Sequence, residues 1–421
     1  MMGLGAMLGT GIFVSIGLGA GLAGPAVLLA LAVAAAVALA NGLASAQLAA
    51  AHPVSGGTYE YGYVYLSPAA GFTAGWVFLI AKSASAATAA LGFAGYLLHA
   101  VGFGPAYLVP VALGAVALLT ALVLTGIRRS STANAAIVSV TLLSLLYFVL
   151  AGLPSIDASR FAPFFAAGAG APAGDANARS ALGAFLEATA LTFVAYTGYA
   201  RIATLGEEVR EPRKTIPRAI IATVALVMVL YLAVAAVGIG VAGSDGLRAA
   251  TDTESATLAV VAQRFGVPGA PFVLAAGAIT AMLSVLLNLI LGLSRVVLAM
   301  ARRGDLFRVL GRLDERRTTP YWAVLAVGAV IAALVTIGNV RTTWSFSAFA
   351  VLIYYALTNL SALRLPAEQR LFPRWVAVFG FLACLGLAFW VERRVWLVGL
   401  GLVIVGLVWH AIARRRAQPS P

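Results

Sequence analysis

Apolar segments long enough to cross a bilayer follow one another along this chain, with only short connections between them. About 20 apolar residues span the hydrocarbon core as an α-helix. Because 62% of the residues are hydrophobic and only 10% are charged, against roughly 25% charged in soluble domains, we expect an all-α integral membrane protein without a separate soluble domain. The predicted spans are 3–21, 25–50, 69–99, 106–125, 133–152, 182–204, 216–243, 268–301, 319–338, 342–363, 374–391 and 395–413.

The basic residues are distributed unevenly over the connections between these twelve segments. If the N-terminus is cytoplasmic, 18 of the 28 lysines and arginines fall on the inner side and 7 on the outer side. This asymmetry follows the positive-inside rule, so the net charge of +13 reflects topology, and nucleic acid is not an expected partner. We expect a multi-pass protein of the cell (plasma or inner) membrane, embedded in lipid, with both termini cytoplasmic.

The sequence patterns of metal sites, cofactor sites and enzymes do not match this chain. It has one cysteine, Cys384, and three histidines that are far apart in sequence, so we expect no metal and no cofactor. The predicted spans carry no paired acids or clustered histidines, as a membrane enzyme would need. A GxxxxGK[ST] loop for ATP is also missing from the sequence, and the continuous polar pore of a channel is not evident.

The first predicted span is interrupted by glycine in the stretch "GAMLGTGIF", residues 5–13. Glycine accepts unusual backbone dihedrals, and irregular backbone survives inside a membrane only where it lines a cavity or meets other protein. Close helix packing is the alternative, because Gly5 and Gly9 form a small-xxx-small pair. The sixth span carries a similar interruption, "AYTG" at 195–198, five spans later. Paired interruptions at corresponding positions predict a transporter built from inverted repeats.

The physics of interrupted helices indicates what they would bind. N–H groups at the start of a half-helix favour an anionic group, through the helix dipole and through direct hydrogen bonds. Unwound carbonyl groups attract a cation. The two interruptions together would hold a carboxylate and an ammonium group, which are the common part of all amino acids.

Four stretches of the chain resemble the amino acid–polyamine–organocation permease superfamily. They are "GAMLGTGIF" (5–13), "HPVSGGTYEYGYVYLSPAAGFTAGW" (52–76), "FVAYTGYARIATLGEEVREPRKTIPRAI" (193–220) and "LNLILGLSRVVLAMARRGDLF" (287–307). The resemblance implies twelve transmembrane helices in a five-plus-five inverted repeat, with helices 1 and 6 broken and two further helices at the C-terminus. The implied boundaries are 1–152 for the first repeat, 153–363 for the second, and 364–421 for the last two helices and a cytoplasmic tail.

The resemblance also implies a substrate site at the two interruptions. N–H groups near Gly9, Thr10 and Gly11 would bind the substrate carboxylate, and carbonyl groups on both helices would receive the amino group. Phe193 and Tyr196 would close the pocket, or would simply pack in the core, since spacing alone does not fix the face they take. The full implied set is Met7, Gly9, Thr10, Gly11, Phe193, Val194, Ala195, Tyr196, Thr197 and Gly198.

Lys82 is unusual because it falls in the middle of the third span. Many proton-coupled members of the superfamily carry a lysine in the fifth span, where this chain has Thr141. An ionisable residue at mid-span is a functional candidate by default, and lysine readily changes its protonation state when desolvated. Lys82 is therefore a candidate for proton coupling or substrate contact. Two structural alternatives stay open, a lysine that snorkels from a helix end and a buried pair with Glu187.

These observations favour a secondary active transporter, a permease that moves amino acids by alternating access with the proton as coupling ion. The alternatives are an amino acid exchanger and a carrier of polyamines or other organic amines.

Overall fold

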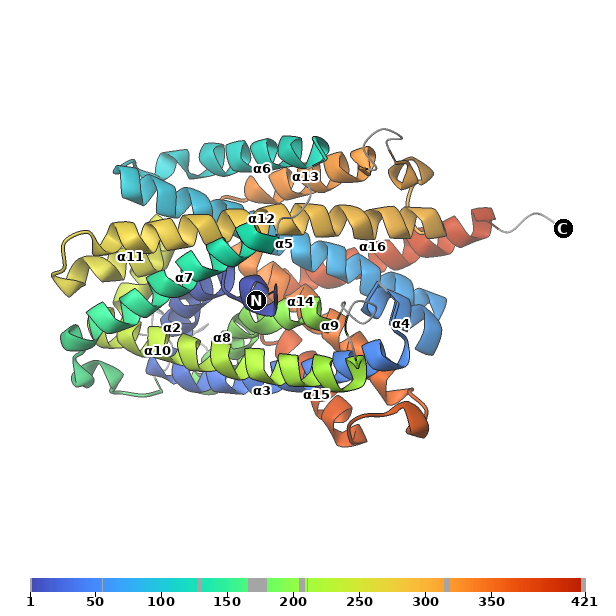
Figure 1. Ribbon diagram of the computed structural model, residues 1–421, viewed down its shortest axis with the longest axis horizontal. Coiled ribbons are helices and arrows are strands. Elements are labelled where there is room, and N and C mark those ends of the chain that lie inside the picture. Colours follow the sequence, from blue (N-terminus) through green and yellow to red (C-terminus); the bar gives the residue numbers. More distant parts are fainter. Residues whose placement is uncertain are drawn as a thin grey trace.

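The structure is a computed structural model that describes residues 2–54, 56–126, 131–165, 180–203, 209, 211–313 and 319–417. The described residues form helices and connecting turns, with no strand among them. Most of the long helices run along the long axis of the molecule (Figure 1). This arrangement agrees with an all-helical protein of the membrane.

Helices occupy each of the twelve predicted segments within the described residues. The first segment is divided into α1 (Met2–Met7), a π-helical turn (Gly11–Ser15) and α2 (Ile16–Ala23). The sixth is divided into α8 (Ala181–Tyr196), a 3-10 turn (Thr197–Tyr199) and α9 (Ala200–Ala203). The other ten are α3 (Val27–Ala51), α5 (Pro68–Val101), α6 (Leu108–Leu124), α7 (Ser131–Gly152), α10 (Pro212–Glu254), α12 (Ala270–Arg303), α13 (Tyr321–Val335), α14 (Val340–Leu363), α15 (Arg374–Ala388) and α16 (Arg393–Ala417).

Length and composition separate these helices into two groups. In the described part of the chain, nine helical stretches are long and apolar enough to cross a bilayer, and the first of them, Leu4–Ala51, covers the first two predicted spans. The helices Tyr321–Val335 and Arg374–Ala388 are apolar but shorter.

Three local features differ from the sequence prediction. Two short helices were not predicted: α4 (Thr58–Tyr65) follows the second span and α11 (Thr257–Ala262) follows the seventh. The seventh helix, α10, begins before the predicted residue 216 and continues beyond 243. Pro212 occupies the first turn of α10, where the missing N–H is no loss, and Gly243 has a left-handed φ of 72° that lets the chain kink and continue as helix.

The central helix α5 packs against α12 and α14. Its buried middle consists of small residues over 83–90, which allow neighbouring helices to approach closely. Two hydroxyl pairs join α5 to α14, between Ser85 and Ser347 at 2.6 Å and between Thr88 and Thr343 at 2.8 Å. These contacts fix the position of Lys82, which lies one turn before Ser85.

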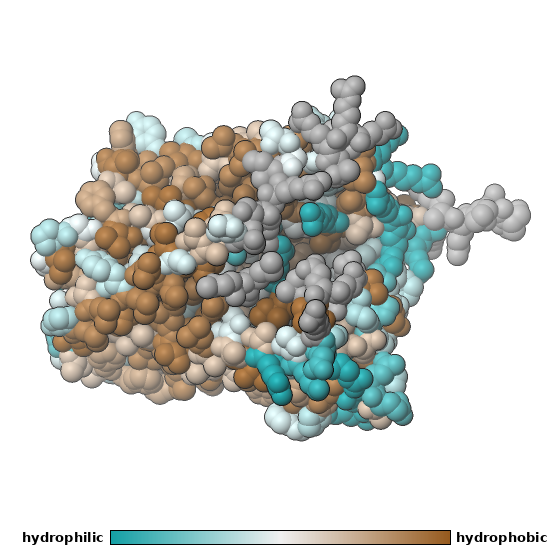
Figure 2. All heavy atoms as spheres, in the orientation of Figure 1, coloured by the Kyte–Doolittle hydropathy of each residue, from teal (hydrophilic) through white to brown (hydrophobic). Residues whose placement is uncertain are grey.

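The hydropathy of the surface changes along the long axis of the molecule. In Figure 2 hydrophobic residues cover most of the visible face, and hydrophilic residues gather at the end that carries α4 and the C-terminal part of α16. Large apolar side chains such as Leu118, Leu150 and Trp375 are each 68% exposed, as expected for residues that face lipid. The inward orientation of the basic end stays a prediction, and Arg128, Arg129, Arg179, Arg210, Arg316 and Arg317, on which the charge count partly depends, lie outside the described residues.

A buried carboxylate, Asp305, joins α4, α12 and α16 at the basic end. It accepts hydrogen bonds from the hydroxyl groups of Tyr59 at 2.6 Å and Tyr63 at 2.8 Å, and it lies 3.4 Å from Nδ1 of His410. Burial, and then the bond to Asp305, raises the pKa of the Tyr59 hydroxyl above its usual value, so this hydroxyl keeps its proton and donates. The guanidinium of Arg303 lies 4.2 Å from the centre of the Tyr63 ring. We call these residues the Asp305 cluster.

Candidate substrate-binding site

The first interruption separates α1 from the π-helical turn. Helix α1 ends at Met7, Leu8 and Gly9 form a turn, and helical conformation resumes at Thr10. Glycine is required here by close approach of other helices. A Cβ atom on Gly9 would lie 2.5 Å from Cγ2 of Val285 in α12, and one on Gly11 would lie 2.6 Å from Cβ of Ala195 in α8.

The second interruption is a tightening of the helix rather than an unwound stretch. Helix α8 passes at Tyr196 into a 3-10 turn, Thr197–Tyr199, before α9 begins. A Cβ atom on Gly198 would lie 2.5 Å from the carbonyl carbon of Ala6. The two interruptions therefore cross in contact, with Gly11 against α8 and Gly198 against the end of α1.

A cavity of about 300 Å³ lies at this crossing, between the interrupted helices and the walls formed by α5, α12 and α14. Eight of the predicted site residues line it: Met7, Thr10, Gly11, Lys82, Val194, Ala195, Thr197 and Gly198. Gly9, Glu187, Phe193 and Tyr196 are not in its wall. The ring of Phe193 packs at 5.8 Å on that of Tyr355, and the ring of Tyr196 packs at 5.1 Å on that of Tyr231, so in this structure both aromatic side chains pack in the core.

The lining of the cavity includes both exposed residues and residues beneath a covering helix. Ala6 and Gly56 both line it and are both exposed. On the opposite side, the Tyr96 hydroxyl donates to the Phe13 carbonyl at 3.3 Å and accepts from the Leu258 N–H at 3.0 Å. Helix α11 is thereby held over the first helix.

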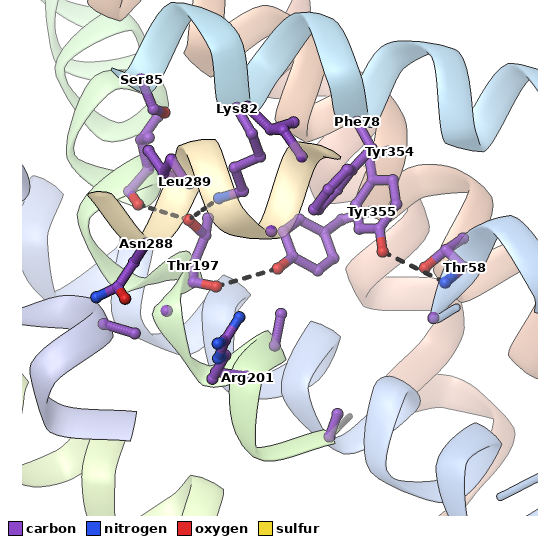
Figure 3. Close-up of a pocket in the computed structure, with 18 of the residues that line it drawn as sticks. Thr58, Phe78, Lys82, Ser85, Thr197, Arg201, Asn288, Leu289, Tyr354 and Tyr355 are labelled. Carbon is purple, nitrogen blue, oxygen red and sulfur yellow. Dashed lines mark hydrogen bonds between the residues drawn. The ribbon is translucent and has the colours of Figure 1, made fainter. Parts of the chain in front are cut away.

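Two polar side chains point to a ligand in the cavity. The Thr10 hydroxyl is only 3% exposed and has no hydrogen-bond partner among the described residues. A buried hydroxyl without a partner is costly, so its place in the cavity wall suits a bound polar group. From the facing helix α5, the Lys82 ammonium group donates to the Thr197 hydroxyl at 3.1 Å, as Figure 3 shows.

The carbonyl groups of the two interruptions already have internal partners, which sequence reasoning did not foresee. Tyr231, on α10, places its hydroxyl 2.6 Å from the Met7 carbonyl and 3.2 Å from the Ala195 carbonyl. The Tyr355 hydroxyl donates to the Thr197 carbonyl at 3.3 Å, and the Thr197 hydroxyl donates to the Val194 carbonyl at 2.8 Å. A carbonyl oxygen has two lone pairs, and three of these carbonyls also accept a backbone N–H: Met7 from Gly9, Val194 from Thr197, and Thr197 from Ala200. A substrate amino group would therefore have to displace one of these donors.

Lys82 and Glu187 lie at different levels of the site. Glu187 is buried on α8, ten residues before Thr197, which corresponds to about 15 Å along a helix axis. The lysine instead makes its hydrogen bond at the second interruption. Thr141, at the fifth-span position discussed above, is fully buried and donates to the Ile137 carbonyl of its own helix at 2.9 Å.

Replacing Tyr231 with phenylalanine should lower stability, because the two bridged carbonyls lose their shared donor. We expect a loss of about 1 kcal/mol, measured as a lower thermal unfolding midpoint in detergent. Tyr147→Phe, which changes a half-buried tyrosine on α7, is the matched control. Equal midpoints for the two variants would contradict a structural role for the bridge.

An all-helical membrane protein with a cavity at the crossing of two interrupted helices belongs to the class of membrane transport proteins. Residues 1–420 match the family Amino acid permease, and the chain belongs to this family. It is 39% identical over its whole length to an uncharacterised transporter of Mycobacterium tuberculosis, covering 91% of that protein. It is 27% identical to a branched-chain amino acid permease of Bacillus subtilis over 99% of this chain and 91% of the permease. It is 31% identical to human cationic amino acid transporter 4 over 88% of this chain and 59% of the transporter.

Proposed function

We propose that this chain is a secondary active transporter that carries amino acids across the cell membrane by alternating access, coupled to protons. The observation that carries the proposal is the cavity at the crossing of the two interruptions. Its wall contains the buried Thr10 hydroxyl, which has no hydrogen-bond partner in the described part of the chain. The proposal includes the five-plus-five repeat, with halves at 1–152 and 153–363 and two further helices over 364–421. Membership in the amino acid permease family supports it.

The substrate carboxylate would bind at the first interruption. Helical structure resumes there at Thr10, and the first N–H groups of a half-helix lack intrahelical acceptors. The N–H groups of Thr10 and Gly11 and the Thr10 hydroxyl would serve as donors, together with the Gly9 N–H, which in this structure donates to the Met7 carbonyl at 2.9 Å. The amino group would approach the carbonyls of Met7 and Ala195, where Tyr231 now donates.

The experiment that tests the function combines binding and uptake. The purified protein is heated with single amino acids and with their decarboxylated analogues, since a ligand that prefers the folded state raises the melting temperature. We expect amino acids to raise it and the corresponding amines to leave it unchanged. Stabilisation by amines alone would favour the organic-amine carrier. Uptake that requires a preloaded amino acid on the opposite side would favour the exchanger.

For proton coupling, Lys82 is the proposed participant and Glu187 the second candidate. Lys82→Ala should give a folded protein whose uptake no longer responds to a pH gradient, while counterflow exchange continues. If Lys82 instead supports the structure through Glu187, Lys82→Ala should destabilise the protein and the double variant with Glu187→Ala should recover much of the loss. Uptake and thermal stability in reconstituted vesicles distinguish the two. Unchanged pH dependence in well-folded Lys82→Ala would exclude coupling through this residue.

The proposed orientation places the basic end, and both chain termini, in the cytoplasm. Cys384 is fully buried, so a thiol reagent should label an introduced surface cysteine with little background from Cys384. Gln369→Cys lies in the exposed connection between α14 and α15, and Ala158→Cys lies in an exposed turn after α7. In intact cells a membrane-impermeant maleimide should label Ala158→Cys and should not label Gln369→Cys. Labelling of Gln369→Cys and not of Ala158→Cys would show that the topology is the reverse of the proposed one.

A further inference from the structure

One face of helix α12 forms a long strip of the cavity wall. The residues of α12 that line the cavity follow one another at separations of three or four along successive turns, which places them on the same side of the helix. They are Val285, Asn288, Leu289, Gly292, Leu293 and Val296. The aliphatic members, Val285, Leu289, Leu293 and Val296, form what we call the aliphatic stripe.

The aliphatic stripe passes directly beside the first interruption. A Cβ atom on Gly9 would lie 2.5 Å from Cγ2 of Val285, so Val285 is next to the turn that precedes Thr10. On the opposite side, Gly11 lies against Ala195 of α8, because a Cβ atom on Gly11 would lie 2.6 Å from Cβ of that alanine. A substrate held by its carboxylate at Thr10 therefore has its side chain directed along α12 and α5, since α8 closes the other direction.

The helices that face α12 add further apolar surface. Phe78 lines the cavity from α5, one turn before Lys82, and its ring packs at 5.2 Å on that of Tyr354. In the view of Figure 3, Phe78 and Leu289 lie on either side of the Lys82 side chain. Trp344 of α14 also lines the cavity, and its indole N–H donates to the Leu191 carbonyl at 2.9 Å. Trp344 therefore presents only ring carbons to a ligand.

Most of the side-chain hydroxyl groups described in the cavity wall already bond within the protein. Those with such partners are Ser45, Thr58, Tyr59, Ser85, Thr197 and Tyr355. The Asn288 amide donates to the Ser284 hydroxyl at 3.4 Å, and Arg201, which also lines the cavity, interacts within the protein as well. The Thr10 hydroxyl, without a partner among the described residues, is assigned to the substrate carboxylate. A polar substrate side chain would thus lose water beside the aliphatic stripe without a hydrogen bond in return, which is unfavourable.

We infer that the substrate is an amino acid with an apolar side chain, which packs along the aliphatic stripe and Phe78 while the carboxylate is held at the first interruption. This inference rests on the proposed function and specifies its substrate class. Removal of the apolar side chain from water favours binding. The backbone groups and Thr10 recognise the part common to all amino acids, and α12 selects among side chains.

The first test uses the unaltered protein and ligands that differ in polarity at nearly equal shape. Leucine is compared with asparagine, and norleucine with lysine, which is norleucine with an added amino group. Thermal-shift titrations and competition for uptake into proteoliposomes give the affinities. We expect the apolar member of each pair to bind about tenfold or more tightly. Glutamate is included because its second carboxylate would find the Lys82 ammonium group if it reached α5.

The possible outcomes separate this inference from the proposed function. Asparagine binding as tightly as leucine, lysine as tightly as norleucine, or glutamate more tightly than leucine would overturn the apolar substrate class and leave the proposed function standing. Binding of no amino acid overturns both.

The second test assigns the preference to α12. Leu289→Ala should weaken leucine binding about tenfold, because part of the apolar contact is lost, and should change alanine binding little, because a methyl side chain does not extend along the stripe. Leu382→Ala is the matched control, since Leu382 is 60% exposed on α15 and is not in the cavity wall. An unchanged ratio of leucine to alanine affinity in folded Leu289→Ala would overturn the inference. If that variant does not fold, the comparison of ligands on the unaltered protein still decides.

Discussion

Replacing Gly11 with leucine should reduce uptake to background while membrane insertion stays normal. A Cβ atom at this position would lie 2.6 Å from Cβ and 2.7 Å from Cα of Ala195, which is far closer than such atoms approach. The leucine must therefore separate the first half-helix from α8, and its side chain would enter the cavity that both helices line. Radiolabelled amino acid uptake in vesicles, normalised to the amount of inserted protein, measures the effect.

Gly114→Leu provides the matched control for this variant. Gly114 is an exposed residue of α6, and a Cβ atom there would meet nothing within 4 Å. Gly114→Leu makes the same change in side-chain size and helix propensity as Gly11→Leu, but at an open position, so uptake should be unaltered. Normal uptake by the Gly11 variant would show that the first interruption is not part of the site.

Replacing Asp305 with alanine should cause the largest loss of stability at the basic end. The carboxylate is 4% exposed and is bonded to the hydroxyl groups of Tyr59 and Tyr63. Removing the shared acceptor leaves the two tyrosine hydroxyl groups without their partner, which costs about 1–3 kcal/mol for a buried group. We expect a clearly lower midpoint of thermal unfolding in detergent, together with easier proteolysis at α4.

Asp245→Ala is the control for the Asp305 variant, because Asp245 is an exposed acid near the other end of the molecule, 3.7 Å from Arg248. Exposed ion pairs contribute little, so its midpoint should stay close to that of the unaltered protein. An Asp305→Ala protein as stable as Asp245→Ala would mean that the Asp305 cluster does not hold α4 and α16 to α12.

Much of the helical framework follows from the sequence, because hydropathy over about 20 residues is a local property that the chain itself displays. The position of the first interruption is also local, since the glycines at 9 and 11 mark it. The short helices α4 and α11 were missed because they lie between the spans: α4 has no long apolar run, and the apolar run of α11, TLAVVA, is far shorter than the about 20 residues that cross a bilayer. The early start of α10 was missed because Pro212 and Pro217 were interpreted as residues of the loop after the sixth helix, whereas Pro212 occupies the first turn of α10 and Pro217 lies within it.

The partners within the site could not be predicted, because they depend on which helix faces are brought together. Tyr231 is one tyrosine in a long apolar span, and nothing near it in sequence indicates a contact with carbonyls at positions 7 and 195. The hydrogen bond from Lys82 to Thr197 joins residues 115 positions apart. The depth of Lys82 made it a candidate, but only the crossing of α5 over the second interruption shows what it touches.

The hydroxyl of Tyr231 has a consequence for the empty protein. The single hydroxyl proton of Tyr231 is shared between the Met7 and Ala195 carbonyls, which lie 2.6 Å and 3.2 Å from the hydroxyl oxygen. The contact between the two interrupted helices therefore does not depend on a bound ligand.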